Sequence, residues 1–264
     1  MCRLFGFAFS DTTKENKKIE YLNSFRQLAL TGAVLNQSVP GHQDGWGTAV
    51  YTEGVTIPSV YKSIHSALYD DNNFDSHQLF QNNIPQSGVA HLRKKTVGEV
   101  SLLNTHPFVD GTYSFVHNGT ICASEQTYGE LATSCDGNTD SERLFKKFLE
   151  IKKNDNLSTE EAFRVMLLET KRLYPGYSAI NTILHDGDAL YVSRVINTDR
   201  PHLEYTKDQM GSYYTVYLGK TKNGDNFISS EKINIDDIVH TSLSNNTFCV
   251  IDRTTGASVC NSLA

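Results

Sequence analysis

The chain has 264 residues, 39% hydrophobic and 20% charged, a composition typical of ordinary globular proteins and unlike disordered or fibrous ones. Its formal net charge of -6 argues against a nucleic-acid binder, which should carry a basic surface. No apolar run approaches the roughly 20 residues that cross a bilayer, and the N-terminus lacks a secretory signal pattern, so we expect a cytoplasmic protein without a membrane partner.

Four aromatic-rich segments in the first half of the chain have the partial alternation of short strands. They are RLFGFAF at 3–9, WGTAVY at 46–51, SGVAHLR at 87–93 and TYSFVH at 112–117. Between the first two, apolar residues recur at helical spacing and Gly32 follows as a stop signal, which predicts a helix over 17–32. Its apolar positions are Ile19, Leu22, Phe25, Leu28 and Ala29.

Two further helices are predicted in the middle of the chain. The segment TDSERLFKKFLEIKK at 139–153 carries one apolar stripe, formed by Leu144, Phe145, Phe148 and Leu149. The next helix begins at Ser158, where Glu161 completes a capping box. The residues it is expected to bury are Ala162, Phe163, Met166 and Leu173.

The last third of the chain has the pattern of hairpin-linked strands. Asp186-Gly187 lies between two apolar runs of the segment 178–196, a strong hairpin signal. Strands are also predicted in YYTVYLG at 213–219, in NFISS at 226–230 and in 246–259. Strands, a block of helices and then more strands describe an α+β fold with antiparallel sheets. No repeat or linker marks a domain boundary.

The five cysteines are Cys2, Cys122, Cys135, Cys249 and Cys260. Their odd number and scattered spacing predict reduced thiols, as in a cytosol, in preference to a disulfide framework. No C-x-x-C pair occurs, which makes a structural zinc knuckle improbable.

Polar residues gather in five short clusters. These are GHQDGWG at 41–47, AHLRKKT at 90–96, NTHPF at 104–108, VHNGT at 116–120 and DGNTDSE at 136–142. Each has an ordinary structural explanation when it is taken alone. Asn118-Gly119 is typical of a hairpin turn, because both residues tolerate positive φ. Asp140 suits the first turn of a helix, Arg93 suits a strand end, and the histidines suit buried positions with satisfied hydrogen bonds.

Taken together and in chain order, MCRLFGF, HLRKKT, NTHPF, VHNG and TDSE resemble the glutaminase domain of class II glutamine amidotransferases, which are N-terminal-nucleophile (Ntn) hydrolases. The block GHQDGWG additionally resembles the stand-alone, YafJ-like branch of that family. The resemblance implies a four-layer αββα sandwich with two antiparallel sheets and no cofactor. It also implies a single domain over 2–264, with a motif-bearing core over 2–142 and a remainder that completes the sandwich.

The same resemblance implies a mechanism in which Met1 is removed and Cys2 is the N-terminal nucleophile. The thiolate attacks the γ-carbonyl of glutamine, its own α-amine is the base, and a γ-glutamyl thioester forms and is hydrolysed. The Asn118 side-chain amide and the Gly119 main-chain N–H would stabilise the oxyanion.

Glutamine is a zwitterion, and the remaining motif residues complement its two charges. Arg93 offers a planar fork to the α-carboxylate, with the Thr96 hydroxyl as a second contact. Asp140 supplies the anion for the α-ammonium. Supporting positions around these groups are His91, His106, His117, Asp44 and Gly45. A weaker resemblance in SSEKI at 229–233 gives Ser229, Ser230 and Glu231 a minor claim on the site.

Several alternatives stay open at this point. The substrate is glutamine or another γ-glutamyl compound, and the released ammonia is either lost or passed to a separate acceptor protein. A catalytically silent domain that binds an amino acid is a second class of function. A metallohydrolase is a third, for which the candidate ligands are His42, Asp44, His91, His106 and His117.

Overall fold

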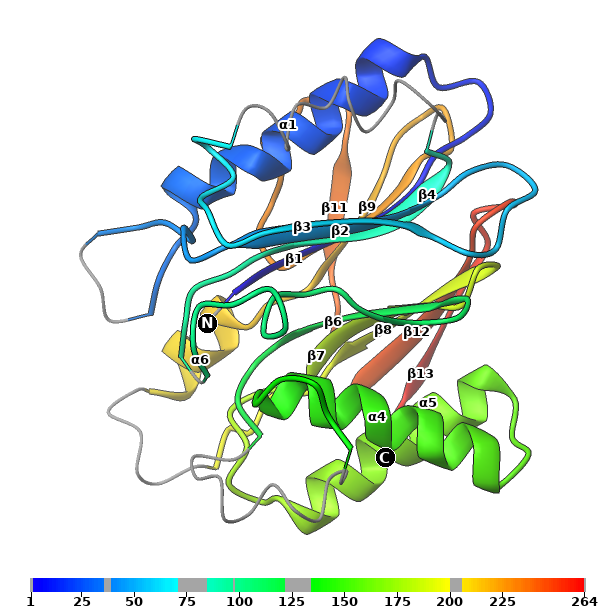
Figure 1. Ribbon diagram of the computed structural model, residues 1–264. Helices are drawn as coiled ribbons and strands as arrows, with labels where there is room; N and C mark the ends of the chain where they lie inside the picture. Colours follow the sequence, from blue (N-terminus) through cyan, green and yellow to red (C-terminus); the bar gives the residue numbers. More distant parts are fainter. Residues whose placement is uncertain are drawn as a thin grey trace.

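Two antiparallel sheets lie face to face, and helices cover the outer face of each sheet, which gives the layer order helix, sheet, sheet, helix (Figure 1). The structure is a computed structural model that describes residues 2–35, 39–70, 85–96, 98–121, 134–199 and 206–263. The layer order of its sheets and helices confirms the predicted α+β sandwich. Within these ranges, no helix combines the length and the apolar character that a membrane span requires.

The first sheet has seven strands, and the N-terminal strand lies in its interior. In sheet order the strands are β11 (Val239–Ser242), β9 (Tyr217–Lys220), β10 (Asn226–Ser229), β1 (Arg3–Ala8), β4 (Ser87–Leu92), β2 (Trp46–Tyr51) and β3 (Ser59–Ser63). Helix α1 (Glu15–Thr31) covers the outer face, where the ring of Phe5 stacks on Phe25 with centroids 5.0 Å apart. Alternate residues of β1, Leu4 and Ala8, enter the core between the two sheets.

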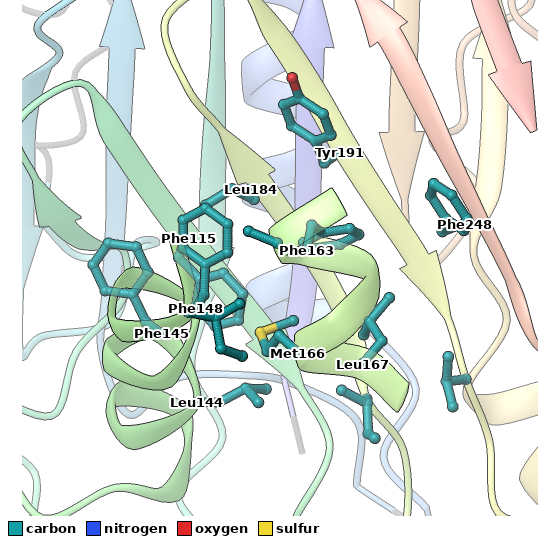
Figure 2. Close-up of a cluster of buried hydrophobic side chains, with 14 of the residues drawn as sticks. Phe115, Leu144, Phe145, Phe148, Phe163, Met166, Leu167, Leu184, Tyr191 and Phe248 are labelled. Atoms are coloured by element: carbon teal, nitrogen blue, oxygen red, sulfur yellow. The ribbon is translucent and has the colours of Figure 1, made fainter. Parts of the chain in front are cut away.

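The second sheet has six strands and is covered by two helices. In sheet order the strands are β13 (Ser258–Ser262), β12 (Thr247–Asp252), β8 (Ala189–Arg194), β7 (Asn181–His185), β6 (Tyr113–Asn118) and β5 (Phe108–Asp110). Helices α4 (Asp140–Asn154) and α5 (Thr159–Leu173) pack on its outer face. Figure 2 shows the core of this layer, in which Phe115 of the sheet stacks on Phe145 of α4 at 5.5 Å.

The helix boundaries follow the sequence signals closely. Helix α1 ends before Gly32, and α5 begins after Ser158 with the predicted capping box. Leu173, however, is 38% exposed, so its predicted burial is wrong. It is the last residue of α5, and the chain turns there to bury Tyr174 in the core in its place.

The predicted strand over 213–219 is wrong in its first part. Helix α6 (Lys207–Tyr213) ends at Tyr213, and only the strand that starts at Tyr217 follows it. This helix begins with a capping box between Thr206 and Gln209, a sequence signal that the strand prediction overlooked.

Two glycine-containing dipeptides have different roles. Asp186-Gly187 joins β7 to β8, with Gly187 at a φ of 104°, as the hairpin signal predicted. Asn118-Gly119 does not form a hairpin turn, because β6 ends at Asn118 and pairs with β5 and β7, of which β7 begins only at Asn181. The ordinary explanation of Asn118-Gly119 is therefore wrong.

One pair of cysteines forms a disulfide. Cys249 and Cys260 are partners in the β12–β13 register and are bonded to each other. The prediction of reduced thiols is thus wrong for this pair. The pairing register of two strands brings these cysteines together, and their spacing in the sequence did not indicate it. Cys2 and Cys135 are free thiols, and Cys122 lies outside the described residues.

Candidate active site

The two sheets meet at the N-terminal end of β1. Cys2 directly precedes β1 in the first sheet, and Asn118 is the last residue of β6 in the second. The main-chain nitrogen of Cys2 donates a hydrogen bond of 2.9 Å to Asn118 Oδ1. The half-buried thiol of Cys2 lies 3.6 Å from the carbonyl oxygen of Lys94, to which it donates. Residues 116 positions apart in the chain are thus in direct contact.

The side-chain amide of Asn118 is used at only one of its ends. Its oxygen accepts from Cys2, which fixes the orientation of the amide. Its nitrogen is fully buried and has no hydrogen-bond partner among the described residues. Buried polar groups are almost always paired, so an unused amide donor beside a thiol indicates a place for a ligand oxygen.

Gly119 follows Asn118 at a point where no other residue fits. A Cβ built on Gly119 would lie 1.8 Å from the carbonyl oxygen of Ala179 and 2.9 Å from Nε2 of His117. The first of these distances involves main chain, which cannot move away as a side-chain tip can. The close approach of two backbone segments therefore requires glycine here.

A small pocket of about 20 Å³ lies at this junction. Seven of the predicted site residues line it, namely Cys2, Arg93, Thr96, His106, His117, Gly119 and Asp140. Four more line it that the sequence analysis had not assigned, namely Lys94, Asn104, Thr139 and Ser141. Its volume is too small for an amino acid, so lining groups would have to move apart for one to bind there.

The predicted supporting residues Asp44 and Gly45 do not line the pocket but hold Arg93 in place. The main-chain N–H of Arg93 donates to Gly45 O at 2.9 Å, and that of Asp44 donates to Arg93 O at 3.0 Å. The Asp44 carboxylate accepts from the N–H of Lys95 at 2.8 Å. Burial lowers the pKa of the Arg93 guanidinium, while the adjacent Cys2 and Asp44 act in the opposite direction.

Asn104 connects the Arg93 segment to the start of α4. Arg93 donates from Nη1 to Glu99 O at 2.9 Å, and Asn104 donates from Nδ2 to the same oxygen at 3.1 Å. Asn104 also exchanges two hydrogen bonds with Asn138, at 2.8 and 2.9 Å. The sequence analysis missed this residue, although its place in the N-x-H-P block, two positions before His106, was a signal for it.

Asp140 and His117 line the pocket from the second sheet and its helix α4. Asp140 is the first residue of α4 and is buried, and one carboxylate oxygen accepts from the N–H of Ile121 at 2.6 Å. His117 Nδ1 lies 2.8 Å from the hydroxyl of Ser141, which the sequence analysis also missed. Burial lowers the pKa of His117, and the neighbouring Asp140 opposes this shift.

His91 lies behind the pocket, stacked on His106 with ring centroids 4.1 Å apart. Both rings are buried, and burial holds the pKa of each well below its usual value, so both are neutral at neutral pH. His42 does not line the pocket, and its Nε2 lies 3.0 Å from Ala33 O. In the part of the chain that the structure describes, no three His, Cys, Asp or Glu side chains are grouped to hold a metal ion.

Comparison with known proteins gives the same family for most of the chain. The family model of class-II glutamine amidotransferases matches residues 1–209. An uncharacterized protein of Methanocaldococcus jannaschii is 32% identical over 72% of this chain and 50% of its own length. The probable glutamine amidotransferase DUG3 of Saccharomyces cerevisiae is 27% identical over 62% of this chain and 54% of its own. The chain thus spans about half the length of these curated relatives.

Solved structures agree on the fold. The glutamine phosphoribosylpyrophosphate amidotransferase of B. subtilis has a TM-score of 0.68 at 12% identity, over 100% of this chain and 49% of that one. A glutamine aminotransferase class-II domain protein of Silicibacter pomeroyi has a TM-score of 0.63 at 16% identity, over 100% of both chains. At these identities the likeness concerns the arrangement of sheets and helices.

Proposed function

Because the chain belongs to the class-II glutamine amidotransferases, we propose that it hydrolyses the γ-amide bond of glutamine or of a γ-glutamyl compound, with Cys2 as the nucleophile. The observation that carries this proposal is the position of the Asn118 amide. Its oxygen holds the main-chain nitrogen of Cys2, and its buried nitrogen has no partner among the described residues.

The nucleophile requires a base within reach. Removal of Met1 would turn the main-chain nitrogen of Cys2 into an α-amine that is already oriented by Asn118. Free α-amines and thiols have similar pKa values, about 8 and about 8.5, so a proton passes readily from one to the other. The contact between the thiol and Lys94 O is weak at 3.6 Å and is easily given up to a substrate.

The oxyanion that forms on attack requires preorganised donors. The Asn118 amide nitrogen and the main-chain N–H of Gly119 are the two groups that suit this role, since both adjoin Cys2 and neither can be replaced without a steric or hydrogen-bonding loss. Removing one such donor in other enzymes lowers the rate by about a hundred- to a thousandfold.

The charged ends of the substrate determine its orientation. Arg93 and Asp140, two buried residues of opposite charge, line the same pocket as the Cys2 thiol. This arrangement complements the α-carboxylate and the α-ammonium of a glutamyl group, and the Thr96 hydroxyl adds a second donor on the Arg93 side. His106 and His117 are held neutral by burial, so they shape the pocket without adding charge.

The reaction then proceeds in two displacements. The Cys2 thiolate attacks the γ-carbonyl carbon, and the tetrahedral intermediate collapses as the C–N bond breaks and the leaving amine takes a proton from the Cys2 α-ammonium. Water, deprotonated by the same α-amine, attacks the resulting thioester and releases glutamate and the free thiol. Transfer of the ammonia to a separate acceptor protein is the second candidate for its fate.

The proposal is tested by intact mass before and after treatment with diazo-oxo-norleucine, an electrophilic analogue of glutamine. We expect a chain without Met1 that gains one adduct, located on Cys2, and no adduct in the Cys2→Ala variant. A chain that retains Met1 in its native host would overturn the N-terminal-nucleophile mechanism. Binding of glutamine by a processed chain without any turnover would favour a silent regulatory domain instead.

A further inference from the structure

A second and much larger cavity, of about 530 Å³, lies beside the nucleophile. Arg3, the residue after Cys2, forms part of its wall, and α6 covers it from the opposite side through Tyr213 and Ser212. Figure 1 shows α6 next to the N-terminus, at the end of the sandwich where the two sheets meet. Glu231, which follows β10, also lines it.

Arg3 is held rigidly in this wall and has one donor to spare. It is 1% exposed, its Nε lies 2.8 Å from a carboxylate oxygen of Glu231, and its Nη2 donates to Ala33 O. The guanidinium carbon lies 4.7 Å from the ring centre of Tyr213. The remaining nitrogen, Nη1, is buried and has no hydrogen-bond partner among the described residues. A fixed, unused guanidinium N–H at a cavity wall favours an acceptor oxygen from a ligand.

The surroundings of Arg3 favour an anionic ligand. An adjoining cavity shares Ser212, Tyr217 and Asp208 with the first. In the cavity of Arg3 itself, the charged lining residues are Arg3, Asp208 and Glu231, and Glu231 is paired with Arg3. The adjoining cavity carries the positive excess, with Arg194, Lys207 and Lys232 against Asp208, in a chain whose formal net charge is -6.

Tyr213 connects this cavity to the nucleophile. Its ring lies against Arg3, and its buried hydroxyl has no hydrogen-bond partner among the described residues. Burial raises the pKa of this hydroxyl, and Arg3 opposes the rise. Cys2 lines the pocket of Arg93 and Asp140, and its chain neighbour Arg3 lines the larger cavity, so the two spaces adjoin at Cys2 and Arg3.

A γ-glutamyl amide has two halves on either side of its reacting carbon. The glutamyl half suits the pocket of Arg93 and Asp140. The leaving half of glutamine is ammonia, which needs no cavity of about 530 Å³ and has no acceptor oxygen for Arg3. The space and the unused donor are explained by a larger leaving amine.

We propose that the cavity of Arg3 binds the leaving half of a γ-glutamyl amide, and that this half is an amine with a carboxylate that Arg3 holds. This inference rests on the proposed function and specifies its substrate as a γ-glutamyl amino acid or peptide. When the C–N bond breaks, the amine nitrogen takes the proton of the Cys2 α-ammonium and leaves through this cavity, while the glutamyl half stays on the thiol as a thioester.

The test compares γ-glutamylglycine with γ-glutamylglycinamide, which differ only in the carboxylate of the leaving half. We expect the wild-type chain to hydrolyse γ-glutamylglycine with a kcat/KM at least about tenfold higher than that of the amide, because a charged hydrogen bond is lost in the latter. In Arg3→Gln this ratio should fall to about one. The double variant R3Q/E231Q, which leaves neither charge unpaired, should give the same ratio and separates recognition from misfolding.

A second variant reduces the volume of the cavity and leaves the buried ion pair of Arg3 and Glu231 unchanged. Ser212 is an exposed residue of α6 that lines the cavity, so Ser212→Trp fills the cavity without disturbing the core. Hydrolysis of γ-glutamylglycine should fall at least about tenfold more than hydrolysis of glutamine, because only the former needs the space.

Failure of this inference and failure of the proposed function are distinguishable. Two results would overturn the inference and leave the function intact, provided that the wild-type chain hydrolyses glutamine. The first is an equal rate for the two γ-glutamyl substrates. The second is a loss of activity in S212W that is equal for all substrates. No hydrolysis of any of the three substrates by a processed chain would overturn both.

Discussion

The amide oxygen of Asn118, at the end of a strand in the second sheet, accepts a 2.9 Å hydrogen bond from the main-chain nitrogen of Cys2, at the start of a strand in the first. This contact joins the two layers at the proposed nucleophile. One side chain thereby holds the main-chain nitrogen of Cys2 and has a buried donor that is free for the proposed oxyanion.

Asn118→Asp separates these two roles. The carboxylate keeps an acceptor for the Cys2 nitrogen but replaces the amide donor with an oxygen that repels an oxyanion. We expect kcat for glutamine hydrolysis to fall by about a hundred- to a thousandfold, measured as ammonia release at saturating glutamine. Wild-type kcat in this variant would show that the Asn118 nitrogen does not stabilise the transition state.

Gly119→Ala tests the close approach of main chain behind the site. The new methyl would start 1.8 Å from Ala179 O, so the backbone must shift, and we expect the free energy of unfolding to fall by about 1–3 kcal/mol together with a loss of activity. Urea denaturation measures the first effect. Gly176→Ala is the matched control, because nothing lies within 4 Å of its Cβ, and it should change stability by less than about 0.5 kcal/mol.

Asp140→Asn tests recognition of the substrate α-ammonium. The substitution keeps an oxygen to accept from Ile121 but removes the charge. The wild-type chain should prefer glutamine over glutaramate, which lacks the α-amine, and the variant should lose most of that preference, by about tenfold or more in the ratio of kcat/KM. An unchanged ratio, with only a uniform drop in rate, would assign Asp140 to structure alone.

Buried neutral histidines predict a loss of stability in mild acid. His185 stacks on Tyr51 at 3.8 Å between ring centres, and its Nε2 lies 2.8 Å from the Ser87 hydroxyl. Burial, and secondarily Arg253, hold its pKa well below the usual value. Below about pH 6.5 the unfolded chain therefore binds a proton that the folded chain does not, and the free energy of unfolding falls as pH falls.

The variant His185→Gln isolates the contribution of this one residue. When the pH is lowered from about 7.5 to about 5.5, the free energy of unfolding should fall less in this variant than in the wild-type chain. The difference between the two proteins should grow by at most about 1.4 kcal/mol for each pH unit below the histidine pKa of the unfolded chain. Urea unfolding at both pH values measures the difference. Identical pH slopes in the two proteins would mean that His185 is protonated in the folded state.

Local signals were sufficient for most of the fold. Gly32, the Ser158–Glu161 capping box and the Asp186-Gly187 turn each act within a few residues, and each marks the boundary that the structure has. Leu173 was predicted to be buried because periodicity does not say where a helix leaves the surface it covers. Strand register, which pairs Cys249 with Cys260, is likewise a property of the folded sheet and not of residue spacing.

The candidate site also has one part that the sequence predicted and another that it did not. The order of the motif blocks identified Cys2, Asn118 and Asp140, which the structure brings to one junction. The grouping of Arg3 with Tyr213 and Glu231 was beyond sequence reasoning, because it depends on which strands become neighbours of β1. The roles of all these residues in catalysis stay predictions until the variants above are measured.

The interior position of β1 has a consequence for biosynthesis. Leu4 bonds to Ser230 through both its N–H and its carbonyl, across 226 positions of the chain, and β1 pairs with β10 along its length. During synthesis from the N-terminus, β1 therefore lacks one of its two neighbours until β10 has left the ribosome. We therefore expect β1 to reach its final place in the sheet only late in translation. If Cys2 is the nucleophile proposed above, the removal of Met1 has that interval in which to occur.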